Sequence, residues 1–194
     1  AGINNILVHS HTTKFTSTQI IINRLIMKLY GVKRLSCGER AGKAFFGNAK
    51  YQIINNAVDA RKFRNVNEEK CAQMRKELFG DHMVIGNLGR LHPQKNHTFM
   101  LDVMEQLVKK NSNIILALYG EGEKESEIKG LVAEKKLASN VLFMGVTNDV
   151  VSAYHMFDLF ILPSLWEGFP VTLVEAQLSG VPSLASDCVS HECD

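Results

Sequence analysis

Short apolar runs alternate with amphipathic segments along the second half of the chain. Five short, mainly apolar segments predict strands at residues 83–88, 114–119, 141–144, 159–162 and 181–185. Four segments with apolar side chains at helical spacing predict helices at residues 97–110, 123–136, 149–156 and 170–179. The side chain of Asn96 is expected to cap the first of these helices. Because strands and helices alternate with short turns, the pattern predicts right-handed βαβ units and a parallel α/β sheet.

The expected sheet is doubly wound and Rossmann-like, with its five strands in the spatial order third, second, first, fourth, fifth. In this order the strands at residues 83–88 and 159–162 are neighbours, and their crossovers leave in opposite directions. Ligands of such sheets bind in the crevice beyond the carboxyl ends of those two strands. The sequence therefore predicts a site built from the loops at residues 89–95 and 163–170.

The first 65 residues are less regular than the rest of the chain. Strands are expected at residues 6–8, 34–37 and 51–54, and helices at residues 16–30 and 39–46. So few elements cannot cover both faces of a sheet. We therefore interpret residues 1–65 as the carboxyl-terminal part of an incomplete α/β domain. Residues 66–194 are then a second domain that stops soon after its fifth strand, so the chain reads as part of a longer protein.

Composition and charge narrow the class of protein. The 194 residues are 45% apolar, and no apolar run approaches the roughly 20 residues of a membrane span. The four cysteines form no C-x-x-C pair, which favours reduced thiols in a cytosolic protein. Residues 1–80 carry a net charge of +9 and residues 81–194 one of −7. Nucleic acid is not an expected partner, because no dense Lys/Arg run is interleaved with aromatic residues.

The basic, isoleucine-rich segment at residues 16–34 has two interpretations. It suits peripheral contact with anionic lipid at the inner membrane surface, close to a lipid-linked substrate. It equally suits an ordinary amphipathic helix whose apolar face packs on a sheet. The pattern alone leaves both open.

Charged side chains gather in the two loops that the strand order brings together. Arg90 and Lys95 in the first loop suit a diphosphate, as a planar fork and a point charge respectively. Glu167 and Glu175 flank the start of the predicted helix, and a carboxylate can accept two hydroxyl protons at once. Gly168 would let a ligand approach the backbone N–H groups at this helix start. Together these groups predict a pocket for a nucleotide sugar.

Several motifs in a fixed order carry a family resemblance. Residues 167–175, Glu-Gly-Phe-Pro-Val-Thr-Leu-Val-Glu, resemble the Glu-x7-Glu motif of glycosyltransferase family 4, retaining enzymes of the GT-B fold. Residues 89–96 resemble the family's diphosphate-binding loop. Residues 54–63 resemble its interdomain P-N-G-V-D…F segment, with Asn in place of Pro and Ala in place of Gly. Residues 8–12 and 37–39 resemble the amino-terminal domain of the branch that makes bacterial capsule and exopolysaccharide.

The resemblance implies two facing Rossmann-like domains, with the donor held mainly by residues 66–194 and with no metal or cofactor. It implies catalytic roles for His11, Glu167, Arg90 and Lys95, with His9 as the alternative to His11 facing the donor sugar. By analogy Glu167 binds the donor sugar hydroxyls, and the two cations bind the diphosphate. The implied donor-binding residues, with Glu175 at the ribose and Gly145 and Val146 near the base, are Glu175, Gly168, Phe169, Pro170, Val171, Gly145, Val146 and Gly89.

The expected function is therefore that of a cytoplasmic retaining glycosyltransferase. It would move a sugar from a nucleoside-diphosphate donor, a UDP-sugar by preference, to a glycan or lipid-linked acceptor in surface-polysaccharide synthesis. Two alternatives stay open. One is a non-catalytic module that binds nucleotide sugars, and the other is a different GT-B enzyme, such as a nucleotide-sugar epimerase.

Overall fold

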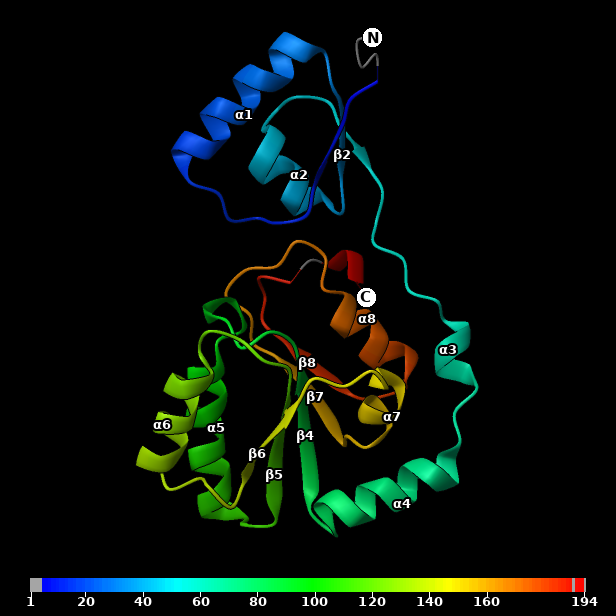
Figure 1. Ribbon diagram of the computed structural model, residues 1–194, viewed down its shortest axis with the longest axis vertical. Coiled ribbons are helices and arrows are strands. Elements are labelled where there is room, and N and C mark those ends of the chain that lie inside the picture. The colour runs from blue at the N-terminus through cyan, green and yellow to red at the C-terminus, as the bar shows by residue number, and fades with distance from the viewer. Residues whose placement is uncertain (1–4, 190, 194) are drawn as a thin grey trace. The chain divides into compact units, whose positions relative to one another are not determined.

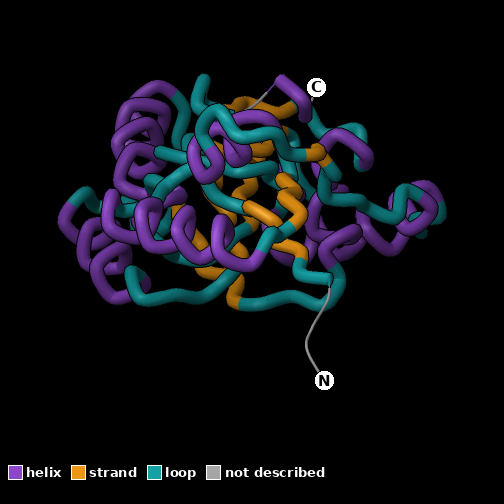
Figure 2. Tube along the Cα trace, turned by 90° about the horizontal axis from the view of Figure 1, so that it is seen from above, coloured by secondary structure: helices purple, strands orange, loops and turns teal. Residues whose placement is uncertain are grey.

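A computed structural model describes residues 5–189 and 191–193 of the chain. The chain divides into two compact units. Unit 1 consists of Ala1–Ala57, Trp166–Val171 and Asp187–Asp194, and unit 2 of Val58–Leu165 and Thr172–Ser186. The elements are labelled in Figure 1, and Figure 2 shows how helix, strand and loop follow one another along the chain.

Unit 2 contains a five-stranded parallel sheet. Its strands are β4 (Met83–Leu88), β5 (Ile114–Tyr119), β6 (Val141–Gly145), β7 (Leu159–Leu162) and β8 (Ser183–Ala185). Their spatial order is β6-β5-β4-β7-β8, which confirms the order predicted from the sequence. The central strand β4 pairs with β5 along its whole length and with β7 through Ile85 and Gly86.

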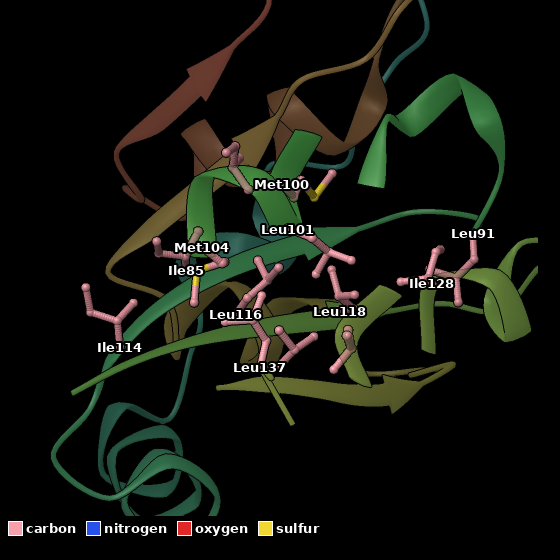
Figure 3. Close-up of a cluster of buried hydrophobic side chains, with 13 residues drawn as sticks. Ile85, Leu91, Met100, Leu101, Met104, Ile114, Leu116, Leu118, Ile128 and Leu137 are labelled. Atoms are coloured by element: carbon pink, nitrogen blue, oxygen red, sulfur yellow. The ribbon is translucent and has the colours of Figure 1, made fainter. Parts of the chain in front are cut away.

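Both faces of this sheet are covered at its central strands β4, β5 and β7, which explains why these strands are mainly apolar. Alternate residues of β5 point to opposite faces, so Ile114, Leu116 and Leu118 share one face. They pack against α5 (His97–Lys110) and α6 (Glu125–Glu134) in the cluster shown in Figure 3. On the other face, a Cβ added to Gly86 would lie 2.1 Å from the ring of Phe157.

The remaining helices after residue 58 differ in how well the sequence predicted them. They are α3 (Arg61–Arg64), α4 (Glu68–Phe79), α7 (Val150–His155) and α8 (Val171–Leu178). The bounds of α5, β4, β5 and β7 agree with the prediction to the residue, whereas α4 was not predicted at all. Helix α4 buries few apolar side chains, among them Cys71 and Phe79, so it lacks a strong apolar period. The side chain of Asn67 accepts a hydrogen bond from the Lys70 N–H (2.9 Å) and marks its start.

Asn96 is the N-cap residue of α5, as predicted, but its side chain does not make the expected capping hydrogen bond. Its backbone is left-handed (φ 56°) because it also ends the short 3₁₀ helix η1 (Pro93–Lys95) that the predicted loop contains. Asparagine is one of the few residues that adopt this conformation readily. The residue type at position 96 is therefore explained by the backbone turn.

Unit 1 contains a three-stranded parallel sheet in the order β1-β2-β3. Its elements are β1 (Leu7–Ser10), α1 (Ser17–Tyr30), β2 (Lys33–Ser36), α2 (Glu39–Phe46), β3 (Gln52–Ile53) and a short 3₁₀ helix, η2 (His191–Cys193). Met27, Val32, Phe45 and Phe46 form its small core. Thr16 begins α1 with a capping box, in which its hydroxyl and the side chain of Gln19 satisfy each other's backbone N–H groups.

None of the helices in the described part of the chain combines the length and apolar composition that crossing a membrane requires.

Candidate functional site

The loops that follow β4 and β7 meet at the carboxyl edge of the unit 2 sheet. The two strands are parallel neighbours, so their carboxyl ends lie at the same edge. The backbone N–H of Leu165, in the loop after β7, donates to the carbonyl of Gln94, in the loop after β4 (2.8 Å). This contact joins the two loops at the point where crevice ligands of doubly wound sheets bind.

The loops after β4, β5 and β6 are also joined to one another at this edge. The N–H of Gly89 donates to the carbonyl of Tyr119 (3.0 Å), and the N–H of Gly120 donates to the carbonyl of Gly145 (2.8 Å). The three loops, which carry the predicted site residues Gly89 and Gly145, are therefore held together by backbone hydrogen bonds. We call this hydrogen-bonded backbone the floor of the candidate site. Val146, the next predicted residue, is exposed beside it.

Two glycines that sequence reasoning left out of the site make this floor possible. A Cβ on Gly120 would lie 2.1 Å from the carbonyl oxygen of Gly89, and one on Gly122 would lie 2.3 Å from that of Leu91. Only glycine allows backbone to approach backbone so closely. The signal in the sequence is a Gly-x-Gly directly after a buried strand, which by itself indicates no more than a turn.

The two predicted cations differ in their surroundings. Arg90 is exposed in the loop after β4. Lys95 lies in η1 and is half-buried, with its side chain turned back so that its Cε would lie 3.0 Å from a Cβ on Gly89. Its charge, together with burial, lowers the pKa of the neighbouring His97 to about 4, with burial the larger cause. His97 is therefore neutral at physiological pH, and Lys95 carries the positive charge at the start of α5.

Glu175 lies on α8 in unit 2 and faces α7. Its carboxylate Oε2 is 3.0 Å from the hydroxyl of Tyr154, which donates to it. Glu175 is half-buried, and this burial raises its pKa while the hydrogen bond from Tyr154 opposes the rise. A carboxylate held in this way is available to accept hydroxyl protons from a ligand.

The segment Trp166–Val171, which holds the first five residues of the Glu-x7-Glu motif, belongs to unit 1. Glu167 is 6% exposed and interacts with at least one other group of the protein. A Cβ on Gly168 would lie 2.1 Å from the carbonyl oxygen of His11 and 3.3 Å from the sulfur of Cys37. Gly168 therefore allows a close approach by the protein's own backbone, where the sequence analysis expected an approach by a ligand. Phe169 follows it, and its carbonyl accepts a hydrogen bond from Asn56 (3.4 Å).

His11 and its alternative, His9, lie together at the end of β1. Both are exposed, and their ring centroids are 4.2 Å apart. Local desolvation and the neighbouring His9 lower the pKa of His11, which favours a neutral ring. Three residues after His11, the Lys14 ammonium lies 3.7 Å from the centroid of the Trp166 ring, a cation–π contact with the residue before Glu167.

The structure thus places the predicted site residues in two groups, one in each unit. Unit 1 holds His11, Glu167, Gly168, Phe169, Pro170 and Val171. Unit 2 holds Gly89, Arg90, Lys95, Gly145, Val146 and Glu175. In the ranges 5–189 and 191–193, no three His, Cys, Asp or Glu side chains gather in a way that could hold a metal ion.

Comparison with known proteins shows the family. Residues 70–194 match the family described as Glycosyl transferases group 1. The whole chain is 31% identical to EpsF of Bacillus subtilis, which is named as a glycosyltransferase. It is 27% identical to the UDP-Gal:alpha-D-GlcNAc-diphosphoundecaprenol alpha-1,3-galactosyltransferase of Escherichia coli. The alignments cover all of this chain and 54% of each relative, so the chain spans about half the length of the curated relatives it matches.

Solved structures agree on the fold. Anabaena Alr3699/HepE in complex with UDP and glucose superposes with a TM-score of 0.86 at 20% identity, over 95% of this chain and 53% of that one. WaaG, a glycosyltransferase involved in lipopolysaccharide biosynthesis, superposes with a TM-score of 0.75 at 15% identity, over 97% and 57% of the two chains. These likenesses confirm the expected α/β fold of GT-B type. With the family match over residues 70–194, they confirm the resemblance seen in the sequence: the chain belongs to the group 1 glycosyltransferases.

Proposed function

We propose that the protein acts as a retaining glycosyltransferase that uses a UDP-sugar. Its acceptor would be a glycan or a lipid-linked saccharide in the synthesis of capsule or exopolysaccharide. Family membership supports the reaction class. UDP-glucose in a HepE structure supports the nucleotide, and the Escherichia coli relative's name gives both a UDP-sugar and a diphosphoundecaprenol-linked acceptor. The observation that carries the proposal is the contact between Leu165 and Gln94, which joins the β4 and β7 loops.

The proposed roles combine the chemistry of each group with the family resemblance. In unit 2, Arg90 and Lys95 bind the diphosphate, Glu175 the ribose, and Gly145 with Val146 the base. Negative charge develops on the departing diphosphate in the transition state, so fixed cations there stabilise the transition state more than the bound donor. In unit 1, Glu167 binds the donor sugar hydroxyls, and His11 faces the sugar. Residues 66–194 then form the donor domain, and residues 1–65 part of the acceptor domain.

A donor panel tests this function. The complete protein is incubated with UDP-, GDP- and ADP-sugars and lipid-linked acceptors, and both nucleotide release and the anomeric configuration of the product are measured. We expect transfer from a UDP-sugar with retained configuration. Binding without transfer to any acceptor would favour the binding-module alternative, and an epimerised sugar would favour the epimerase.

The proposed roles of Arg90 and Lys95 are tested by comparing the binding of UDP with that of uridine, which lacks the phosphates. In Arg90→Ala and Lys95→Ala we expect the affinity for UDP to fall about 10- to 100-fold each, because each loses a charge-assisted contact. The affinity for uridine should stay unchanged. Lys109→Ala, which removes an exposed cation from the last turn of α5, is the matched control. An equal loss of uridine and UDP binding would contradict the assignment to the diphosphate.

The exposed face of α1 supports a peripheral membrane role on the cytoplasmic side. Six large apolar side chains of this helix are exposed: Ile21, Ile22, Leu25, Ile26, Leu29 and Tyr30. Lys28 lies among them in the last turn. Apolar side chains beside a cation are the composition of helices that lie in a membrane interface. We therefore propose that α1 contacts anionic lipid near the acceptor.

Co-sedimentation with phosphatidylglycerol–phosphatidylethanolamine vesicles tests this contact. Leu29, at 80% exposure, is the side chain to change. We expect Leu29→Glu to weaken vesicle binding about tenfold, since it removes a large apolar side chain and adds a repelled charge. Phe99→Glu, on the exposed side of α5, is the control and should bind as the unchanged protein does. If neither the unchanged protein nor Phe99→Glu binds vesicles, the exposed face of α1 packs on protein and not on lipid.

A further inference from the structure

Tyr154 lies in the core of unit 2 with its hydroxyl at the carboxylate of Glu175. Its exposed fraction is 0%, so neighbouring protein atoms enclose the whole side chain. The rings of Phe157 and Phe160 surround it, with centroids 6.0 and 5.6 Å away, both edge-on. A phenol packed in this way holds its hydroxyl at one place. That place is 3.0 Å from Oε2 of Glu175.

The hydroxyl has two acceptors and one proton. The carbonyl of Thr172 is also 3.0 Å from the Tyr154 oxygen. A phenol donates a single proton, and an ionised carboxylate is a stronger acceptor than a neutral carbonyl. Burial, followed by the charge of Glu175, raises the pKa of Tyr154 far above its ordinary value, so the phenol keeps its proton throughout the working pH range. Tyr154 therefore acts as a permanent donor toward Glu175.

This contact leaves a defined part of the carboxylate for a ligand. An ionised carboxylate has about four acceptor positions on its two oxygens. The hydroxyl of Tyr154 occupies one of them on Oε2. Because this hydrogen bond already restricts rotation of the carboxylate, a ligand that binds it has a smaller entropy cost to overcome.

We infer that Tyr154 is a positioning residue for donor binding, which holds the Glu175 carboxylate in the orientation that accepts the two ribose hydroxyls. This inference rests on the proposed function, because it deepens the role of Glu175 in that site. Tyr154 itself is a fully buried residue of α7 whose hydroxyl contacts α8, so it would not touch the donor directly. Its effect on the ribose passes through Glu175 alone.

The first test compares UDP with 2′-deoxy-UDP in Tyr154→Phe, by calorimetry on the full chain. We expect the affinity for UDP to fall roughly tenfold, because the carboxylate loses its anchor. The affinity for 2′-deoxy-UDP should fall less, so that the preference for the 2′-hydroxyl shrinks. Tyr51→Phe is the matched control. It also removes a hydroxyl that donates to a carbonyl, that of Glu39, but in unit 1, and should leave both affinities unchanged.

The second test uses the pH dependence of UDP binding. Among the described residues, the titratable group that contacts Glu175 is the Tyr154 phenol, and its hydrogen bond lowers the carboxyl pKa against the rise from burial. Without the hydroxyl, the pKa of Glu175 rises. UDP binding that needs the ionised carboxylate is lost as pH falls through that pKa. The acidic limb of the binding curve should therefore move to higher pH in Tyr154→Phe, a shift that mere loss of packing would not produce.

A double-mutant cycle asks whether Tyr154 acts through Glu175. Glu175→Asp shortens the side chain by one methylene and withdraws the carboxylate from the hydroxyl without changing α7. Adding Tyr154→Phe to Glu175→Asp should then have no further effect on UDP affinity.

The outcomes separate the inference from the function beneath it. If the unchanged protein does not bind UDP, the proposed function fails. If it binds UDP and Glu175→Ala weakens the binding, the function stands. Unchanged affinity, 2′-hydroxyl preference and acidic limb in a folded Tyr154→Phe would then overturn the inference about Tyr154 alone.

Discussion

Replacing Glu175 with alanine is expected to lower kcat/KM for the UDP-sugar about 100- to 1,000-fold. The estimate corresponds to two charge-assisted hydrogen bonds to the ribose, each contributing roughly 1.5–2 kcal/mol. The variant also leaves the buried hydroxyl of Tyr154 without its carboxylate. Steady-state transfer kinetics on the complete protein, together with calorimetry for UDP, measure the loss.

The fold should tolerate this change better than the activity does. Burial raises the pKa of Glu175, so the folded protein binds this proton more tightly than the unfolded chain. Its contribution to stability is therefore present below the unfolded pKa and is lost as pH rises through the folded pKa. Ionisation of this buried side chain therefore lowers stability, a cost that is common among residues kept for function.

Controls on the same helix separate the two effects. Gln177→Ala changes an exposed side chain two positions along α8 and should leave kinetics and melting temperature unchanged. Glu175→Gln keeps the size of the side chain but removes its charge, and should lose most of the activity. A Glu175→Ala protein with normal turnover would remove this carboxylate from the proposed site.

The order of the strands could be predicted because local pattern and chain topology agree. Apolar runs such as residues 114–119 are buried on both sides, and right-handed crossovers leave few possible sheets. From that order alone it follows that the loops after β4 and β7 meet, as the hydrogen bond from Leu165 to Gln94 shows.

Other features depend on contacts that no local pattern encodes. Helix α4 buries too few apolar residues to show a period, and its cap at Asn67 is a single residue. Strand β8 begins at Ser183, two residues later than predicted, since Pro182 lacks an N–H to donate to the sheet. The partner of Glu175 is Tyr154, 21 positions away on another helix, and an apolar-looking aromatic residue in a sequence gives no sign of such a contact.

The close contacts of Gly168 and Gly120 could not be predicted from the sequence either. A sequence shows that a residue is glycine but not which atoms pack against it. At Gly168 the neighbour is the carbonyl of His11, within unit 1, and at Gly120 it is the carbonyl of Gly89. Both are contacts of backbone with backbone. They depend on the packing of loops, which forms only once the sheets place the strand ends.

Gly120→Ala is expected to be the most destabilising single change in the candidate site. Gly120 has φ +127°, a conformation that L side chains rarely adopt, and its added Cβ would lie 2.1 Å from the carbonyl oxygen of Gly89. Backbone strain and overpacking together predict a loss of about 2–4 kcal/mol in the free energy of unfolding. For a chain of this size, the melting temperature should fall by about 5–15 °C. Thermal unfolding followed by circular dichroism measures it.

A second glycine in the same βα segment provides the control. Gly130 lies in the exposed part of α6, and a Cβ added there would meet nothing within 4 Å. Gly130→Ala should therefore stabilise the protein by about 0.5–1 kcal/mol, because alanine loses less backbone entropy in a helix. Gly120→Ala should also weaken UDP binding, since relief of the clash displaces the Gly89 loop that carries Arg90. An alanine at position 120 that changes neither melting temperature nor UDP affinity would mean that the three loops are not packed backbone against backbone at this edge.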